Sequence, residues 1–174
     1  MKIRYFVIIG ILLAAITARI IWVNHAFPQA ENIKIDKGAC YVDEKGISYK
    51  VEKTKWLDKK QIEEEFDMKL FSVCIVTMQV ENTSKKKKKL AAYDWYIEGE
   101  NHFQNGVSCE LFGVVNEEFS DMGVVLEPGE KIEWKLPYEF CNTIVYSFQN
   151  KKEMKSALYG LIKDRYPKKV WLVI

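Results

Sequence analysis

The chain has 174 residues, of which 26 are Lys or Arg and 24 are Asp or Glu, so its formal net charge is only +2. A nearly neutral chain offers no extended basic surface, and no nucleic-acid partner is predicted. Hydrophobic residues make up 48% of the sequence, which is enough for one membrane segment and one buried core.

Residues 5–23 form a nearly unbroken apolar run close to the amino terminus. As an α-helix this run is about 28 Å long, close to the ~30 Å hydrocarbon thickness of a bilayer. Lys2 and Arg4 precede the run. By the positive-inside rule, residues 1–4 are expected in the cytoplasm and the rest of the chain after the run outside the cell membrane, which is crossed once.

Two interpretations of the apolar run remain open, a permanent anchor and a cleaved signal peptide. Cleavage requires small residues at A-x-A spacing, but Ala18, Ala26 and Ala30 each have a larger residue two positions earlier. Arg19 lies near the outer end of the run, where its guanidinium can extend to the interface. We expect an uncleaved signal anchor, followed by a stalk over residues 24–36.

Residues 37–174 are predicted to form one domain, mainly β: an immunoglobulin-like antiparallel β-sandwich with one or two short helices. Residues 43–46 form the turn of a first hairpin, Asn105-Gly106 is expected to be a turn, and Pro128-Gly129 fits a type II turn. The strands expected are 39–42, 47–51, 70–80, 90–97, 107–115, 123–126, 131–136 and 169–174.

The core of the domain is predicted around the strand at 70–80, whose even-numbered residues from Ser72 to Val80 share one face. Tyr93, Trp95 and Ile97 alternate along another strand in the manner of an aromatic ligand platform, but burial between the sheets is the better interpretation. The residues expected in one inter-sheet core are Val76, Met78, Val80, Trp134 and Leu136.

Two helices are expected to interrupt the strands. Asp58, followed by Gln61, can cap a helix of two turns. Asn150 can cap a later helix whose third residue is Glu153, and this helix should dock on the rim of the core through Leu158 and Leu161. Its apolar stripe consists of Met154, Ala157, Leu158, Leu161 and Ile162.

Three phrases in the body give the chain a likeness to a known family when they are taken with the anchor Arg19-Ile20-Ile21-Trp22-Val23-Asn24. They are Val80-Glu81-Asn82-Thr83-Ser84, Leu126-Glu127-Pro128-Gly129-Glu130 and Leu136-Pro137-Tyr138-Glu139-Phe140. The chain resembles uncharacterised single-pass proteins of Gram-positive bacteria that carry an immunoglobulin-like extracytoplasmic domain. The resemblance implies the membrane topology of the chain and the cellular compartment of its domain. It assigns no activity and no functional residue.

No catalytic or metal-binding constellation is predicted. His25 and His102 are the only histidines, and neither lies in a pattern that would activate a nucleophile. The acid runs 63–65 and 117–118 fit neither a calcium loop nor a glycosidase pair. We therefore predict no enzyme, no cofactor and no metal.

The cysteines leave two possibilities open. Cys40, Cys74, Cys109 and Cys141 lack the C-x-x-C spacing of a zinc site. An exported domain can join four cysteines by disulfides in three connectivities, but Cys74 lies in an apolar strand, where a free thiol also packs well.

The sequence contains two candidate interaction sites, a run of five lysines and a set of small residues at four-residue spacing. Lys85, Lys86, Lys87, Lys88 and Lys89 are expected at the exposed tip between two strands. They make either a solubilising loop or a contact for an anionic partner such as lipid headgroups, wall polymer or an acidic protein patch. Gly10, Ala14 and Ala18 recur at the four-residue spacing that favours helix pairing in lipid.

The predicted function is a membrane-anchored extracytoplasmic binding domain, non-enzymatic, that holds a partner protein or an envelope polymer near the cell surface. The alternative is an accessory or immunity-type subunit of a membrane protein or transporter complex. In that case the transmembrane helix would pair with helices of the larger protein through its small residues.

Overall fold

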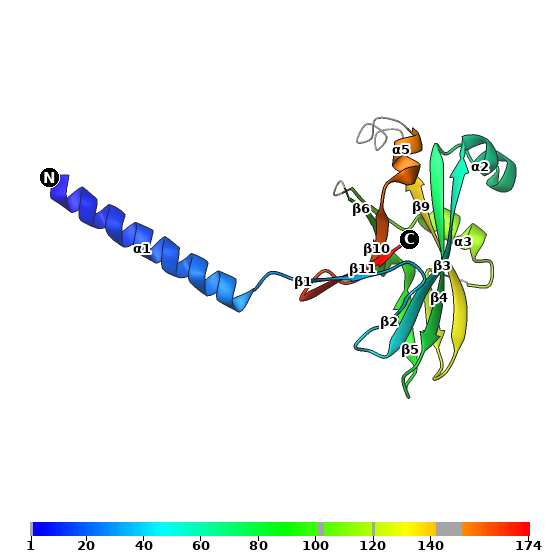
Figure 1. Cartoon of the computed structure of the whole chain (residues 1–174), viewed down its shortest axis with the longest axis horizontal. Helices are drawn as coiled ribbons and strands as arrows, with labels where there is room; N and C mark the ends of the chain where they lie inside the picture. Colours follow the sequence, from blue (N-terminus) through cyan, green and yellow to red (C-terminus); the bar gives the residue numbers. More distant parts are fainter. Residues whose placement is uncertain (1, 101–102, 120, 142–150) are drawn as a thin grey trace.

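The computed structural model describes residues 2–100, 103–119, 121–141 and 151–174 (Figure 1). Its first element is α1 (Lys2–Ala26), a single helix that projects away from the β-rich body. The segment Arg4–Ala26 has 23 residues, a mean hydropathy of 2.5 and no buried residue in its most apolar window. The apolar side chains of α1 therefore pack on nothing within the described chain, unlike those of a core helix.

Two sheets face each other in the body. One has the order β1 (Glu31–Ile35), β11 (Lys168–Val173), β10 (Tyr159–Ile162), β6 (Tyr96–Gly99), β7 (Gln104–Gly106). The other has the order β2 (Cys40–Val42), β3 (Ile47–Asp58), β4 (Ser72–Asn82), β9 (Lys131–Phe140), and β5 (Lys88–Ala91) pairs with β8 (Gly123–Leu126) in a separate ladder. The predicted antiparallel, immunoglobulin-like sandwich after an apolar helix is confirmed. In the described ranges only β1 and β11 pair in parallel.

The inter-sheet core contains the residues that strand alternation predicts. Met78 and Trp134 are paired across β4 and β9, and both are completely buried. The opposite face of β4 is also covered, because Val73 and Ile75 pack with Ile62 and Leu111 in a second, smaller cluster. One core cluster holds Val76, Met78, Val80, Trp134 and Leu136, as expected.

Local turn and capping signals are also confirmed. Asp58 caps α2 (Lys59–Phe66) and forms a capping box with Gln61. The turn before β9 has Gly129 at φ 79°, the left-handed conformation that a type II turn requires at this position. The hairpin of β2 and β3 has the predicted turn at 43–46.

The strand expected at 107–115 is wrong, because residues Cys109–Val115 form helix α3. The Ser108 side chain caps this helix by accepting a hydrogen bond from the Leu111 amide at 3.4 Å. Leu111 and Phe112 are both buried, in two different clusters, so packing outweighs the strand propensity of the valines that follow.

The late helix is much shorter than predicted. Helix α5 ends at Ser156, and the expected helical turn with Leu161 is instead strand β10 between β6 and β11. The segment is a strand because it pairs with β6 and β11, and Gly160 leaves room for the indole of Trp171, since a Cβ at position 160 would lie 2.2 Å from its Nε1. Leu161 is in the core as a strand residue and Leu158 is half-buried, so the predicted helical docking is wrong. Asn150 lies outside the described residues.

Two further boundaries differ from expectation. A 3-10 turn, η1 (Ala92–Asp94), interrupts the strand predicted at 90–97, which leaves Tyr93 62% exposed while Trp95 and Ile97 are buried. Asn105-Gly106 lies within β7 and is not a turn. The 3-10 turn lies where the chain passes from one sheet to another, and Asn105-Gly106 is a strand because it pairs with Tyr96 and Ile97 of β6; local propensity shows neither.

The predicted stalk is shorter than 24–36. Glu31–Ile35 forms β1, which pairs with β11, so the folded body begins at Glu31. Only residues 27–30 connect the end of α1 to the first strand. The body is therefore held close to the end of the apolar helix.

Candidate functional site

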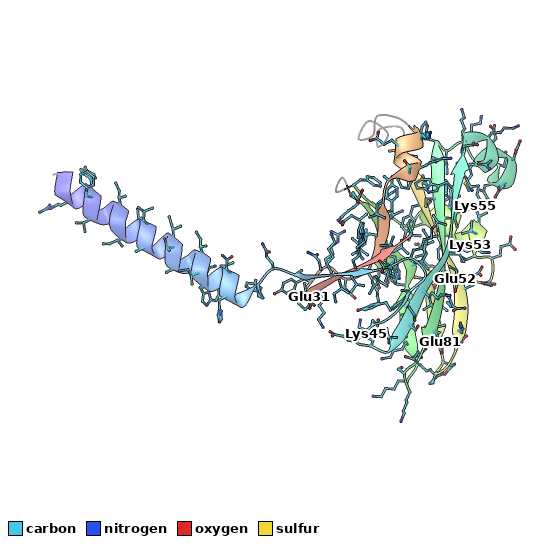
Figure 2. All side chains as sticks on the ribbon, in the orientation of Figure 1. Glu31, Lys45, Glu52, Lys53, Lys55 and Glu81 are labelled. Atoms are coloured by element: carbon cyan, nitrogen blue, oxygen red, sulfur yellow. The ribbon has the colours of Figure 1, made fainter. Side chains whose placement is uncertain are left out.

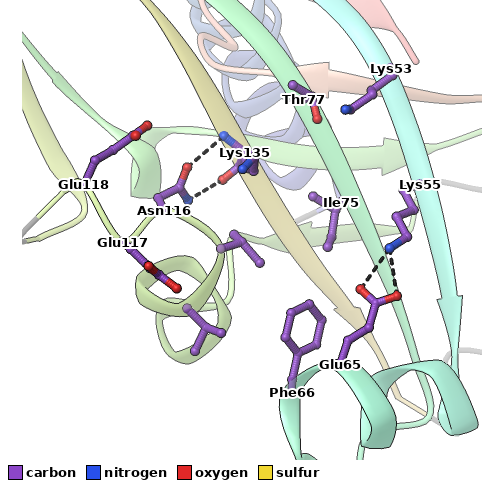
Figure 3. A pocket seen from close by; sticks show the side chains of 12 residues that line it. Lys53, Lys55, Glu65, Phe66, Ile75, Thr77, Asn116, Glu117, Glu118 and Lys135 are labelled. Carbon is purple, nitrogen blue, oxygen red and sulfur yellow. Dashed lines mark hydrogen bonds and ion pairs between the residues drawn. The ribbon is translucent and has the colours of Figure 1, made fainter.

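A groove of about 460 Å³ crosses the outer face of the four-stranded sheet between α2 and α3 (Figure 3). Lys53 of β3, Thr77 of β4 and Lys135 of β9 form one row across its floor. Its volume is in the range of about 300–1,000 Å³ that is usual for small-ligand sites. The lining residues are Lys53, Lys55, Glu65, Phe66, Ile75, Thr77, Val114, Val115, Asn116, Glu117, Glu118 and Lys135.

Charges of both signs surround this groove. The ammonium of Lys55 lies 2.8 Å from each carboxylate oxygen of Glu65. Within the described residues no carboxylate lies at ion-pair distance from Lys53 or Lys135. The two ammonium groups can bind an anionic group, while Glu117 and Glu118 oppose a large polyanion. The groove therefore suits a small ligand or a peptide segment that carries both charges.

Asn116 fixes one wall of the groove to its floor. The side chain is 3% exposed. Its amide donates to the Lys135 carbonyl at 2.8 Å and accepts from the Lys135 amide at 3.0 Å. Strand β9 is at the edge of its sheet, so Asn116 pairs backbone groups that would otherwise face away from every strand.

Replacing Asn116 by Ala is expected to lower the free energy of unfolding by about 1–3 kcal/mol, because two backbone groups of Lys135 lose their partner. Urea unfolding measures the change. Asn116→Asp is the matched variant: it would bury a carboxylate facing the Lys135 carbonyl, so its loss at neutral pH should be at least as large as that of Asn116→Ala and should diminish at acidic pH, where the protonated carboxyl can donate. An unchanged unfolding midpoint in Asn116→Ala would contradict this role.

The predicted lysine tip lies between β4 and β5, and we name residues 83–89 the lysine loop. Lys85, Lys86 and Lys87 are exposed in the connection, whereas Lys88 and Lys89 already belong to β5. The Glu127 carboxylate forms an ion pair with Lys87 and raises the pKa of that ammonium. Exposure of the run was predictable, and its partial inclusion in a strand was not.

A buried asparagine shapes the lysine loop. Asn82 has no exposed surface, and its amide donates to the carbonyls of Lys86 at 2.8 Å and Leu126 at 3.0 Å. Its side-chain oxygen accepts from the Ser84 amide at 3.0 Å. This role was not predicted, although an Asn at the end of a strand and two residues before a Ser is typical of an Asx turn.

The candidate helix-pairing residues lie where the periodicity places them. Gly10, Ala14 and Ala18 share one face of α1 and are exposed. No other helix of the described chain packs there, so pairing with another membrane protein stays a prediction. Arg19 stacks on Trp22, with 4.8 Å between the guanidinium carbon and the ring centre.

A buried charged cluster lies elsewhere, where the sequence offers no signal for it. The Lys163 ammonium donates to the Tyr49 hydroxyl at 2.9 Å and lies 3.4 Å from the Asp43 carboxylate. The Tyr49 hydroxyl donates to the same carboxylate at 3.2 Å. Burial, followed by the Asp43 charge, raises the pKa of Tyr49, so its hydroxyl stays protonated as a donor. These groups are paired with one another, which is typical of a structural cluster.

The remaining titratable candidates are dispersed. Burial raises the pKa of the Cys74 thiol, which makes this cysteine inert as a nucleophile. Cys40 and Cys109 are exposed free thiols. His25 lies at the end of α1, and His102 falls outside the described residues. In the ranges that the structure describes, no group of three His, Cys, Asp or Glu could hold a metal.

These features define a class: a β-sandwich domain that follows one apolar helix. The chain belongs to the family described as Domain of unknown function (DUF5028), whose profile matches residues 24–170. The predicted membership of an uncharacterised domain family is therefore confirmed. No protein of curated function is significantly similar to this chain.

Several solved structures are similar at low sequence identity. A putative lipoprotein of Bacillus subtilis is 14% identical with a TM-score of 0.50, over 79% of this chain and 38% of that protein. An uncharacterised β-sandwich protein of Clostridium difficile is 9% identical with a TM-score of 0.46, over 84% and 96% of the two chains. The secreted protein MPT63 of Mycobacterium tuberculosis is 12% identical with a TM-score of 0.49, over 83% and 98%. None of the three is named for an enzymatic activity.

Proposed function

We propose that this protein is a single-pass, membrane-anchored domain that works outside the cytoplasm of a Gram-positive bacterium by binding a partner, without catalysis. One observation carries the proposal: the 23 residues of Arg4–Ala26 form an apolar helix that the folded body leaves uncovered. Exposed apolar surface of this size is costly in water and stable in a bilayer. A helix of this length matches the hydrocarbon core.

The two ends of the helix support its orientation. Lys2 and Arg4 precede the apolar run and favour a cytoplasmic amino terminus. At the other end, the stacked pair of Arg19 and Trp22 suits the outer interface, where amphipathic side chains are stable. The Bacillus lipoprotein of the same fold is consistent with a domain of the cell envelope.

The body supports binding as its activity. The groove between α2 and α3 combines the ammonium groups of Lys53 and Lys135 with the apolar wall of Phe66 and Val115. Such a lining can select a ligand by its charge and by its shape. Cys74 belongs to the same strand β4 as Ile75 and Thr77, but it packs in the inter-sheet core on the opposite face of the sheet, and His25 lies at the end of α1.

Protease treatment of intact protoplasts tests the anchor and its orientation. We expect digestion of the body, with a membrane-bound fragment that retains the apolar helix. The matched control is the variant Lys2→Glu with Arg4→Glu, which removes the flanking positive charge and should increase the protected fraction of the body. A mature protein in the medium that begins near residue 19, 27 or 31 would contradict the proposal, as would full protection of the wild-type body.

A further inference from the structure

We propose that the lysine loop binds anionic phospholipid headgroups of the membrane that holds α1, and so docks one end of the sandwich on the bilayer surface. The inference rests on the proposed anchoring of the chain. The docking end carries the turns at 43–46, 83–87, 127–130 and 163–167, and we name it the turn end. The helices α2 and α5 lie at the opposite end (Figure 1).

The chain leaves the membrane helix and joins the body at this same turn end. The Glu31 amide donates to the Pro167 carbonyl at 2.9 Å. The next residue, Lys168, forms an ion pair with Glu44 in the hairpin turn at 3.0 Å. These contacts place the start of β1 beside the turn at 43–46.

The lysine loop lies against the other side of that hairpin turn. The amide and the hydroxyl of Thr83 both donate to the Gly46 carbonyl, at 2.9 and 2.8 Å. Ser84 is so close that a Cβ on Gly46 would lie 2.9 Å from its own Cβ. Figure 2 shows Lys45 of this turn and Glu81 of β4 at the lower end of the body, away from Lys55.

The connection to the membrane helix keeps this end near the bilayer. Only residues 27–30 separate α1 from β1. Five peptide units span at most about 17 Å when fully extended. The start of β1 therefore stays close to the end of α1, and the body has to turn its turn end toward the bilayer for the lysine side chains to reach it, because electrostatic attraction decays over a Debye length of about 8 Å.

Four of the carboxylates at the turn end are paired, whereas Glu130 and Asp164 form no ion pair within the described residues; the five lysines of the loop outnumber these two acids and set the local sign of the charge. Asp43, Glu44, Glu81 and Glu127 each form an ion pair with a base. In the described chain no carboxylate lies at ion-pair distance from the ammonium groups of Lys85, Lys86, Lys88 and Lys89. Four ammonium groups thus remain available for phosphate oxygens.

One acidic region of the body disfavours docking through its own side. Residues 90–126 contain no Lys or Arg and seven Asp or Glu residues. These include Glu110, Glu117 and Glu118 in and beside α3. An anionic bilayer repels this region and attracts the lysine loop. Because Asn82 already orders the loop, little conformational entropy is lost when it binds.

The test uses the full-length chain in nanodiscs of phosphatidylcholine alone or of phosphatidylcholine with phosphatidylglycerol at low salt. Acetylation of each lysine is followed by mass spectrometry. With the anionic lipid, we expect the four unpaired lysines to react about five-fold more slowly, the factor that corresponds to ~1 kcal/mol per lysine. High salt should restore the rates. Lys59 and Lys60 of α2, at the opposite end, should react equally in both lipids.

Docking has a second reporter in Lys45, which is exposed at the turn end outside the lysine loop. Its protection by anionic lipid should disappear when Lys85–Lys89 are all replaced by Gln. The charge-matched control replaces Lys59, Lys60, Lys69, Lys152 and Lys155, around α2 and α5, by Gln and should keep the protection of Lys45.

Each result supports or overturns the proposal. Equal acetylation in both lipids, or protection that survives the replacement of Lys85–Lys89, overturns docking. Protection by soluble polyglycerol phosphate but not by phosphatidylglycerol overturns the lipid as partner in favour of a wall polymer. A chain that does not remain with the nanodisc contradicts the anchor instead, so failure of the proposed function is distinguished from failure of docking.

Discussion

Replacing Asp43 by Ala is expected to lower the free energy of unfolding by about 3–5 kcal/mol, as when a buried ion pair loses one partner. The side chains of Lys163 and Asp43 are only 13% and 8% exposed. Without Asp43 the Lys163 ammonium would remain in this site next to the Tyr49 hydroxyl, with no carboxylate in contact. The turn would also lose the hydrogen bonds from the Lys45 and Ile47 amides at 2.9 and 2.8 Å.

Two variants separate the charge from the turn. Asp43→Asn keeps an acceptor for the turn amides but removes the negative charge. The double variant Asp43→Asn with Lys163→Met removes both charges and should be more stable than Asp43→Asn alone. Urea unfolding of the set measures the coupling. If Lys163→Met does not recover stability, the loss in Asp43→Ala comes from the turn and the ion pair is unimportant.

The second large effect is expected in the core, where Trp134→Ala should lower the free energy of unfolding by about 3–5 kcal/mol. Trp134 has no exposed surface and packs edge-on against Phe112, with 6.1 Å between ring centres and 82° between ring planes. The substitution removes the ring contact between Trp134 of β9 and Phe112 of α3 and leaves a cavity beside Met78, the neighbour of Trp134 across the sheet. Differential scanning calorimetry of the variant measures the loss.

Trp134→Phe is the matched control for this cavity. The indole Nε1 of Trp134 is buried and has no hydrogen-bond partner among the described residues. Phe keeps much of the volume and removes this unpaired donor, so its cost should be clearly smaller than that of Ala. If Trp134→Phe and Trp134→Ala lower the free energy of unfolding equally, the complete indole ring is required at this site and an aromatic ring of smaller size does not fill the cavity.

Elements whose signals are local were predictable from the sequence. The hairpin turn at 43–46, the capping box of Asp58 and the type II turn at Pro128-Gly129 each depend on a few adjacent residues. The alternation in β4 likewise identified which side chains enter the inter-sheet core. Such features require no knowledge of the partner strand.

Elements whose secondary structure depends on residues far away in the sequence were not predictable. Residues 159–162 have a helical apolar pattern, yet they form a strand because β6 and β11 flank them. Residues 109–115 have strand propensity, yet they form the helix that covers β9. The groove escaped prediction for the same reason, because Lys53, Thr77 and Lys135 become neighbours only through strand register.

The parallel pairing of β1 with β11 has a mechanical consequence. Five residues of β1, from Glu31 to Ile35, pair with Lys168 to Leu172, and β1 follows the apolar helix α1 almost directly. Under the proposed anchoring of α1, any pull between the anchor and the body acts along β1. Because the hydrogen bonds of a parallel ladder are evenly spaced, a load in this direction shears them together instead of opening them one after another. The chain thus places a shear-resistant clamp, closed by its last strand, where tension would enter the domain.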